Sequence, residues 1–154
     1  MPTVKKKVAA KRSARPTTAS SARRTAAYQT GLKLRKKVVG PDYVARSIKS
    51  ADDLNRDFQD MVTGMAWGTV WTRKGLSLRD RSMLTLAFCI ALNRPHEIVI
   101  HLRGAIRNGV TRTELRELLI HSFIYCGGPA AMDAIRTVRE ALPEIERSEG
   151  KRRR

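Results

Sequence analysis

Apolar residues recur at helical spacing along most of this chain, and glycine, proline or a helix-capping residue ends each stretch. A period of three to four residues predicts α-helices. No stretch of useful length alternates polar and apolar residues as a half-buried β-strand does. With 154 residues there is room for one domain with a moderate core. The sequence therefore predicts an all-α helical bundle with a single domain.

Proline, glycine and helix-capping residues indicate where each expected helix begins and ends. Pro143 is expected to end the last helix, and a short turn is expected around residues 43–48. The segment 78–92 is apolar on most sides, so we expect it to lie centrally. The expected helices are 28–38, 52–65, 78–92, 95–108, 111–126 and 130–142.

The positive charge of the chain is concentrated at its two ends. The formal net charge is +17, of which residues 1–27 and 151–154 carry 12, leaving +5 for residues 28–150. Residues 1–27 have no acid, no aromatic residue and no apolar period, a composition that cannot offset the entropy cost of ordering. We predict a basic disordered extension (1–27), a folded domain (28–145) and a basic C-terminal tail (146–154).

The basic extension allows three interpretations, of which a solvated extension is favoured. An organelle transit peptide and an arm that binds nucleic acid or another polyanion are the alternatives. The extension lacks the apolar segment of a secretory signal, and the chain has no run of about 18 apolar residues that suggests a membrane span. We therefore expect a cytoplasmic protein without membrane contacts.

The two cysteines, Cys89 and Cys126, are far apart in the sequence. They form neither a Cys-x-x-Cys redox pair nor a cysteine zinc cluster. Without an export signal both thiols are expected to stay reduced and buried. A nucleophilic role for Cys126 is the less favoured alternative.

A carboxylate and an imidazole lie one helical turn apart in the segment that Pro95 opens. Glu97 and His101 are four residues apart, so both side chains fall on one face of the helix. Burying such groups only for packing is costly, which makes them candidates for catalysis. The alternative is a buried pair that ties helices together.

Several short motifs occur together in a specific order and spacing. Together they resemble the carboxymuconolactone decarboxylase family, over about residues 28–142. The motifs are Trp67-Gly68, Trp71-Thr72-Arg73, Gly75-Leu76, Arg81-Ser82, Glu97 to His101, Asn108-Gly109-Val110-Thr111 and Tyr125-Cys126-Gly127.

This resemblance implies an alkylhydroperoxidase-like fold, a ring-shaped homohexamer and no cofactor or metal. The implied reaction is decarboxylation of 4-carboxymuconolactone, a lactone dicarboxylate, to 3-oxoadipate enol-lactone in protocatechuate (β-ketoadipate) catabolism. Another lactone-handling enzyme of this fold, or a polyanion-binding protein acting through its tails, are the alternatives. Peroxidases of the superfamily use Cys-x-x-Cys, but Arg94 and Glu97 occupy those positions here, which disfavours disulfide chemistry.

The implied chemistry assigns roles to five residues. His101 is expected either to donate the proton that carbon takes up after carbon dioxide leaves or to donate a hydrogen bond to the lactone oxygen, and Glu97 to orient His101 or fix its protonation state. Arg81 and Arg73 are candidates for binding the carboxylates, and Trp67 for lining the pocket. Salt bridges for the arginines and a core or subunit contact for the tryptophans are the alternatives. His96 is expected at the surface or an interface, and His121 in the core or an interface.

Overall fold

The computed structural model describes residues 25–152, and all regular structure in that range is helical. The prediction of an all-α fold is confirmed. The helices are α2 (Ala26–Val39), α3 (Pro41–Lys49), α4 (Arg56–Met61), the π-helix η1 (Val62–Val70), α5 (Leu78–Ala91), α6 (Pro95–Arg107), α7 (Arg112–Cys126) and α8 (Gly128–Arg152).

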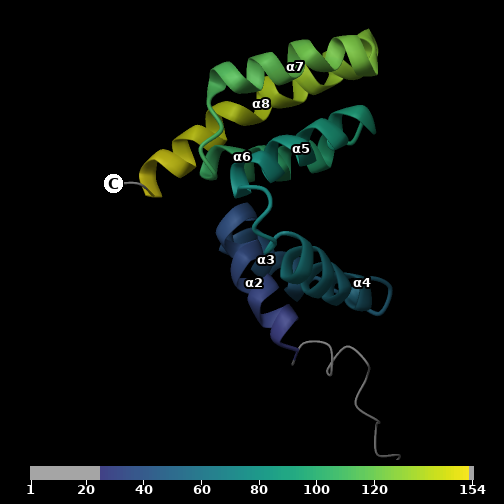
Figure 1. The fold of residues 1–154 in the computed structure, drawn as a ribbon, viewed down its shortest axis with the longest axis vertical. Coiled ribbons are helices and arrows are strands. Elements are labelled where there is room, and N and C mark those ends of the chain that lie inside the picture. Colours follow the sequence, from purple (N-terminus) through teal and green to yellow (C-terminus); the bar gives the residue numbers. More distant parts are fainter. Residues whose placement is uncertain (1–24, 153–154) are drawn as a thin grey trace, which may run out of the picture.

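The helices form two lobes that α6 connects (Figure 1). The N-terminal lobe contains α2, α3, α4 and η1 around a small core that includes Val38, Val44 and Trp67. The C-terminal lobe contains α5 to α8 around a larger core. Leu102 of α6 is part of the larger core, whereas Ile100 of the same helix packs against the smaller one. Helix α6 therefore places its side chains in both lobes.

Helix α2 lies against η1 at backbone distance because glycines face each other there. A Cβ atom on Gly31 would lie 2.0 Å from the Thr63 carbonyl oxygen, and one on Gly68 would lie 2.1 Å from the Ala27 carbonyl oxygen. Only a residue without a side chain fits at such a distance. The two glycines thus set the separation of α2 and η1.

Helix α5 begins at a well-formed cap and is buried on one side only. The Ser77 hydroxyl accepts a hydrogen bond from the Asp80 amide (3.1 Å), which satisfies an N-terminal donor of the helix. Leu86 and Ile90 are fully buried, but Phe88 is 63% exposed. The helix was expected to be central. Its inner side is buried as expected, but its outer side exposes apolar side chains.

Two predicted boundaries in the N-terminal lobe were wrong. Residues 43–48 form part of the helix α3 and not a turn, since Pro41 begins a helix whose residue Val44 is fully buried. The second expected helix is a short α-helix followed by a π-helix, η1. A π-helix closes hydrogen bonds over five residues, a geometry that apolar periodicity does not reveal.

The last helix continues past Pro143, so its predicted end was wrong. Proline in a helix interior removes one backbone hydrogen bond and costs about 3 kcal/mol. Here Ile145, at 1% exposure, packs in the core, and the Glu149 carboxylate pairs with Arg107 at 2.7 Å. These contacts offset the cost, and residues 146–152, predicted as a basic tail, form the end of α8. The predicted extension 1–27 lies almost wholly outside the described residues.

Replacing Gly31 with alanine tests the close approach of α2 and η1. We expect Gly31→Ala to lower the free energy of unfolding by about 3 kcal/mol, because the new methyl group forces the two helices apart. Urea denaturation followed by circular dichroism measures the change. Gly150→Ala is the matched control, since Gly150 lies in α8 with open space at its Cβ, and it should leave stability unchanged or raise it by up to about 1 kcal/mol. Equal stabilities of the two variants would contradict the packing.

Candidate active site

Helix α6 brings the predicted Glu97 and His101 together near its start. Asn93, with a φ angle of 49°, turns the chain, and Pro95 occupies the first turn of the helix. The Glu97 Oε2 and His101 Nε2 atoms are 3.9 Å apart, which is an electrostatic contact and too long for a hydrogen bond. The Glu97 side chain is 50% exposed and that of His101 17% exposed. The imidazole therefore points inward while the carboxylate reaches solvent.

A cavity of about 270 Å³ lies beside this pair, between α6 and the N-terminal lobe. Its polar side chains come from α6 and from the helices of the N-terminal lobe, so residues that are far apart in the sequence line one cavity. Trp67, Glu97 and His101, three of the five predicted site residues, line it. The full lining is Arg35, Val39, Tyr43, Phe58, Gln59, Val62, Trp67, Glu97, Ile100 and His101.

Burial lowers the pKa of His101 from its usual value of 6.5, and the nearby Glu97 carboxylate opposes this shift to a smaller extent. Desolvation disfavours the charged imidazolium, and a negative neighbour favours it. Near neutral pH His101 is therefore an uncharged imidazole, which can donate one hydrogen bond and accept another. A negatively charged ligand beside His101 would raise its pKa again.

Arg35 supplies a buried cation to the same cavity. Its residue exposure is 4%, and it extends from α2 to donate hydrogen bonds to Thr63 Oγ1 (3.0 Å) and Gln59 Oε1 (2.9 Å). Burial lowers the pKa of Arg35, while interactions with Tyr43 and Tyr28 raise it. Within residues 25–152 no carboxylate forms an ion pair with it. Such a cation is suited to bind an anionic ligand.

Sequence reasoning missed Arg35, although a signal was present. Arg35 falls on the inward face of α2, where Tyr28, Gly31 and Val38 are buried at helical spacing. A single arginine on an otherwise apolar helix face is as informative as the Glu97 and His101 pair.

The other two predicted arginines lie outside this cavity in the single chain. Arg73 is exposed and lines a separate groove beside α2. Arg81 Nη2 donates a hydrogen bond to the Arg73 carbonyl oxygen (2.9 Å), so it holds the loop between η1 and α5 in place. The structure thus brings Arg73 and Arg81 next to each other and not next to His101.

Trp67 also belongs to the core of the N-terminal lobe, whereas His96 and the two cysteines lie outside the cavity. Trp67 is buried and its ring contacts that of Trp71, with centroids 4.5 Å apart. His96 is exposed as expected. Cys89 is buried and Cys126 half-buried, both as free thiols.

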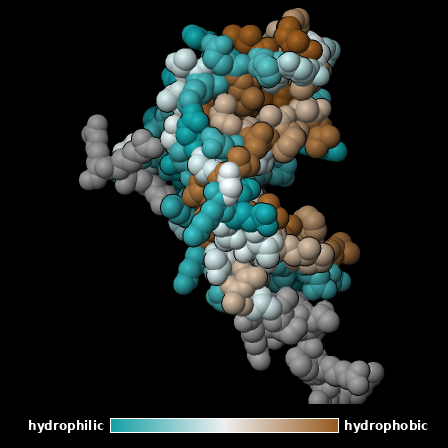
Figure 2. All heavy atoms as spheres, in the orientation of Figure 1, coloured by the Kyte–Doolittle hydropathy of each residue, from teal (hydrophilic) through white to brown (hydrophobic). Residues whose placement is uncertain are grey.

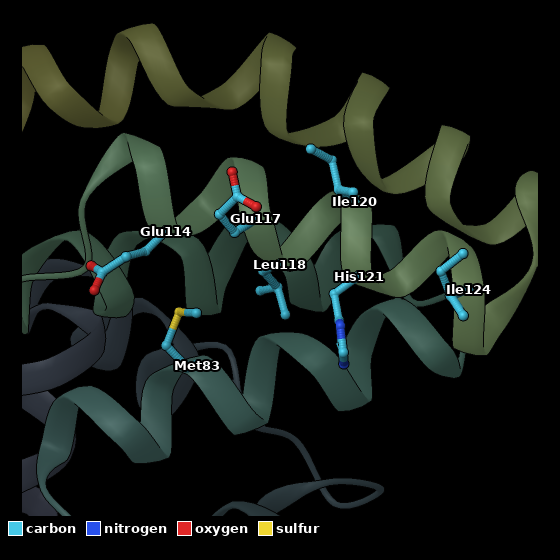
Figure 3. Close-up of a pocket in the computed structure, with 7 residues that line it drawn as sticks. All are labelled: Met83, Glu114, Glu117, Leu118, Ile120, His121 and Ile124. Atoms are coloured by element: carbon cyan, nitrogen blue, oxygen red, sulfur yellow. The ribbon is translucent and has the colours of Figure 1, made fainter.

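His121 is exposed and not in the core, and it lies beside a second hollow of about 460 Å³ between α5 and α7. Figure 3 shows His121 and Leu118 pointing from α7 toward α5, with Met83 facing them. The His121 ring contacts that of Tyr125, with centroids 4.6 Å apart. Glu114, at the other end, bonds to Arg79 and caps α7, so its carboxylate is already engaged.

Two further observations concern residues 25–152, the part of the chain that the structure describes. Its His, Cys, Asp and Glu side chains form no group of three or more that could hold a metal ion. None of its helices is long and apolar enough to cross a membrane.

Comparisons with known proteins give matches over most of the chain. Residues 56–140 match the model of the carboxymuconolactone decarboxylase family. The chain is 41% identical over 118 residues to an Acinetobacter baylyi protein named 4-carboxymuconolactone decarboxylase, covering 77% of this chain and 88% of that protein. It is 39% identical over 126 residues to a Metarhizium robertsii protein named nitrosuccinic acid decarboxylase, covering 81% and 88%.

The lowered pKa of His101 predicts a pH dependence of stability. The unfolded chain takes up a proton at a higher pH than the folded protein, so the stability contributed by the neutral imidazole is fully present above about pH 6.5. It is lost as the pH falls from there toward the lower folded pKa. Comparing the free energy of unfolding at about pH 7.5 and pH 5.5, we expect a smaller loss for His101→Gln than for the wild type. His96→Gln, which changes an exposed histidine, should behave like the wild type; identical losses in all three proteins would show that His101 is not the group responsible.

Proposed function

The chain belongs to the carboxymuconolactone decarboxylase family, and on this premise we propose that it decarboxylates 4-carboxymuconolactone to 3-oxoadipate enol-lactone. The observation that carries the proposal is the cavity in which Arg35, His101 and Trp67 meet. The two named relatives are both decarboxylases, and the matched region contains His101, Glu97 and Trp67.

The proposed substrate can accept the electrons that the reaction releases. It is an unsaturated five-membered lactone with a ring carboxylate and an acetate arm. When the bond to the ring carboxylate breaks, carbon dioxide leaves and the electron pair moves through the ring double bond to the lactone carbonyl. A proton then adds to the ring carbon next to that carbonyl. This sequence needs no added electron acceptor, so we propose that the reaction is cofactor-independent.

Each requirement of this reaction has a candidate group in the cavity. Hydrogen bonds to Thr63 and Gln59 and the interaction with Tyr43 fix the Arg35 guanidinium at the cavity, where its positive charge attracts a substrate carboxylate. The apolar ring of Trp67 favours the neutral carbon dioxide over the hydrated carboxylate. A bound dianion raises the pKa of His101, so the imidazole takes up a proton and gives it to carbon. Glu97, half-exposed, orients the imidazole and links it to solvent.

Arg73 and Arg81 remain proposed carboxylate ligands under one condition. Because neither lines the cavity within one chain, their role requires that a neighbouring subunit bring them to it. The charge that binds substrate within the subunit is assigned to Arg35.

The second named relative supports an alternative substrate, nitrosuccinate. It also carries two carboxylates and a group that withdraws electrons from the carbon that loses carbon dioxide. The two substrates share the demands for cationic binding and proton delivery. Assaying both with the same enzyme preparation distinguishes them by their kcat/KM values.

We further propose that the protein assembles as a homohexamer. Large apolar side chains are exposed over both lobes, as Figure 2 shows in brown. Exposed apolar area of this extent marks a protein interface. Phe58 lines the cavity yet is 63% exposed, so a neighbour on this face would help to close the site. The exposed residues include Leu54, Phe58, Met61 and Met65 near α4 and η1, Leu84, Phe88 and Leu92 at α5, and Ile120, Phe123, Ile124 and Tyr125 on α7.

For the remaining parts of the chain we propose that the folded domain, predicted at 28–145, extends from the start of α2 to the end of α8, and that the basic extension before it takes no part in catalysis. We place the reaction in the cytoplasm, in protocatechuate catabolism. A basic extension that bound nucleic acid would give an affinity that falls steeply with salt and is lost on deletion of residues 1–24, which leaves α2 and its cap Thr25 in place.

Direct assay of the purified protein without added metal or cofactor tests the reaction and its proton donor. We expect release of carbon dioxide from 4-carboxymuconolactone, with kcat lowered about 100-fold or more in His101→Gln because a positioned proton donor is lost. Glu97→Gln should lower kcat less, since Glu97 acts through His101. His96→Gln is the matched control on the same helix and should keep wild-type kcat. Wild-type turnover by folded His101→Gln would contradict the role assigned to His101. A wild-type protein that has the mass of a hexamer and releases no carbon dioxide would contradict the proposed reaction.

Light scattering tests the assembly. The wild type should have the mass of six 17.3 kDa subunits. Phe88→Asp and Ile124→Asp each place a charge on an exposed apolar face and should reduce the mass while the helical signal in circular dichroism is kept. Lys49→Gln, an exposed polar change on α3, should leave the mass unchanged. A monomeric wild type would contradict the assembly.

A further inference from the structure

A groove of about 700 Å³ lies between α2 and the loop that joins η1 to α5. Lys33 and Lys37 of α2 and Arg73 of the loop line it, together with the apolar Trp71 and Leu76. We refer to this hollow as the basic groove. No acidic residue is part of its lining.

The three cations of the basic groove have no carboxylate partners. Between residues 25 and 152, neither Lys33 nor Lys37 nor Arg73 forms an ion pair with an Asp or Glu side chain. Lys33 and Lys37 are also four residues apart on one helix face, a spacing at which like charges repel. The groove therefore holds a repulsion that a bound anion would relieve.

Hydrogen bonds and ring contacts hold the walls of the groove in place. Arg81 Nη2 bonds to the Arg73 carbonyl oxygen at 2.9 Å, and the Trp71 ring is supported by Trp67. The nearest acid along the chain, Asp80, accepts a hydrogen bond from Ser77 Oγ (2.7 Å). The other carboxylate oxygen of Asp80 lies 3.5 Å from Arg79 Nη1, so the charge of Asp80 is paired with Arg79 and not with a cation of the groove.

The basic groove is separate from the cavity that contains His101. The two hollows share no lining residue, and the tryptophan pair stands between them, with Trp67 lining the cavity and Trp71 the groove. Within one subunit, a ligand in the groove therefore contacts none of the residues that line the cavity.

We infer that the basic groove is a second binding site, and that its ligand is a short organic dicarboxylate. Lys33 and Lys37 are separated by about 6 Å along the helix axis, so each can bind one end of a small dianion. Trp71 and Leu76 provide apolar contact for the carbon chain between the carboxylates. Inorganic phosphate has charge but no such chain, and it is therefore the informative competitor.

Isothermal titration calorimetry of the full chain with succinate at low ionic strength tests this site. We expect saturable binding that the double variant Lys33→Gln/Lys37→Gln weakens about tenfold or more, because two charged partners are lost. Lys49→Gln, an exposed lysine outside the groove, should change the affinity less than about twofold. His101→Gln should keep succinate binding, and the double lysine variant should keep the wild-type kcat.

Several outcomes would overturn the inference. Absence of binding, or equal succinate affinity in the wild type and the double lysine variant, would remove the site. Loss of binding in His101→Gln alone would place succinate in the cavity. Equal affinity for inorganic phosphate at matched ionic strength would identify a nonselective cationic surface, and a proportional loss of kcat in the double lysine variant would make the groove part of the catalytic site.

Discussion

The backbone contact between α2 and η1 is the constraint on which the rest of the structure depends. Gly31 and Gly68 let two helices meet without intervening side chains. This separation sets where Arg35, on α2, meets Thr63 and Gln59, and it sets where Trp67 faces α6. A helix pair held further apart by ordinary side chains would carry the guanidinium out of reach of its two hydrogen-bond acceptors. The same contact between α2 and η1 therefore determines both the packing of the N-terminal lobe and the position of Arg35 in the cavity.

Burial affects the charge of Arg35 and the charge of His101 differently. Arg35 stays charged because a guanidinium holds its proton strongly, and two of its N–H groups bond to the neutral oxygens of Thr63 and Gln59. His101, whose pKa is lowered by burial, is uncharged near neutral pH. The site therefore presents a permanent cation beside a group whose charge follows the ligand. That division suits a substrate that enters with two negative charges and leaves one of its carboxylates as a neutral gas.

Helix content and the Glu97 and His101 pair could be predicted, because both follow from spacing within one segment. The cavity itself could not, since it joins α2, η1 and α6, and pairing of distant helices is not encoded in local periodicity. The continuation of α8 past Pro143 is a similar case. A local rule ends the helix there, and burial of Ile145 with the Arg107 to Glu149 ion pair outweighs it. Helix α5 was predicted to be central, but periodicity does not say which of its apolar residues are buried, as Leu86 and Ile90 are, and which are exposed, as Phe88 is.

The exposed apolar side chains of α5 and α7 have a consequence for how this protein behaves on dilution. If association covers Phe88 and Phe123, the free energy that keeps each subunit folded includes a contribution from mass action. The melting temperature then rises with protein concentration, as it does not for a self-sufficient monomer. Newly made chains, before they meet, expose the same surfaces to every other apolar surface nearby. If the chains associate in this way, the rate of synthesis in the cell bears on how much of the protein reaches its folded form.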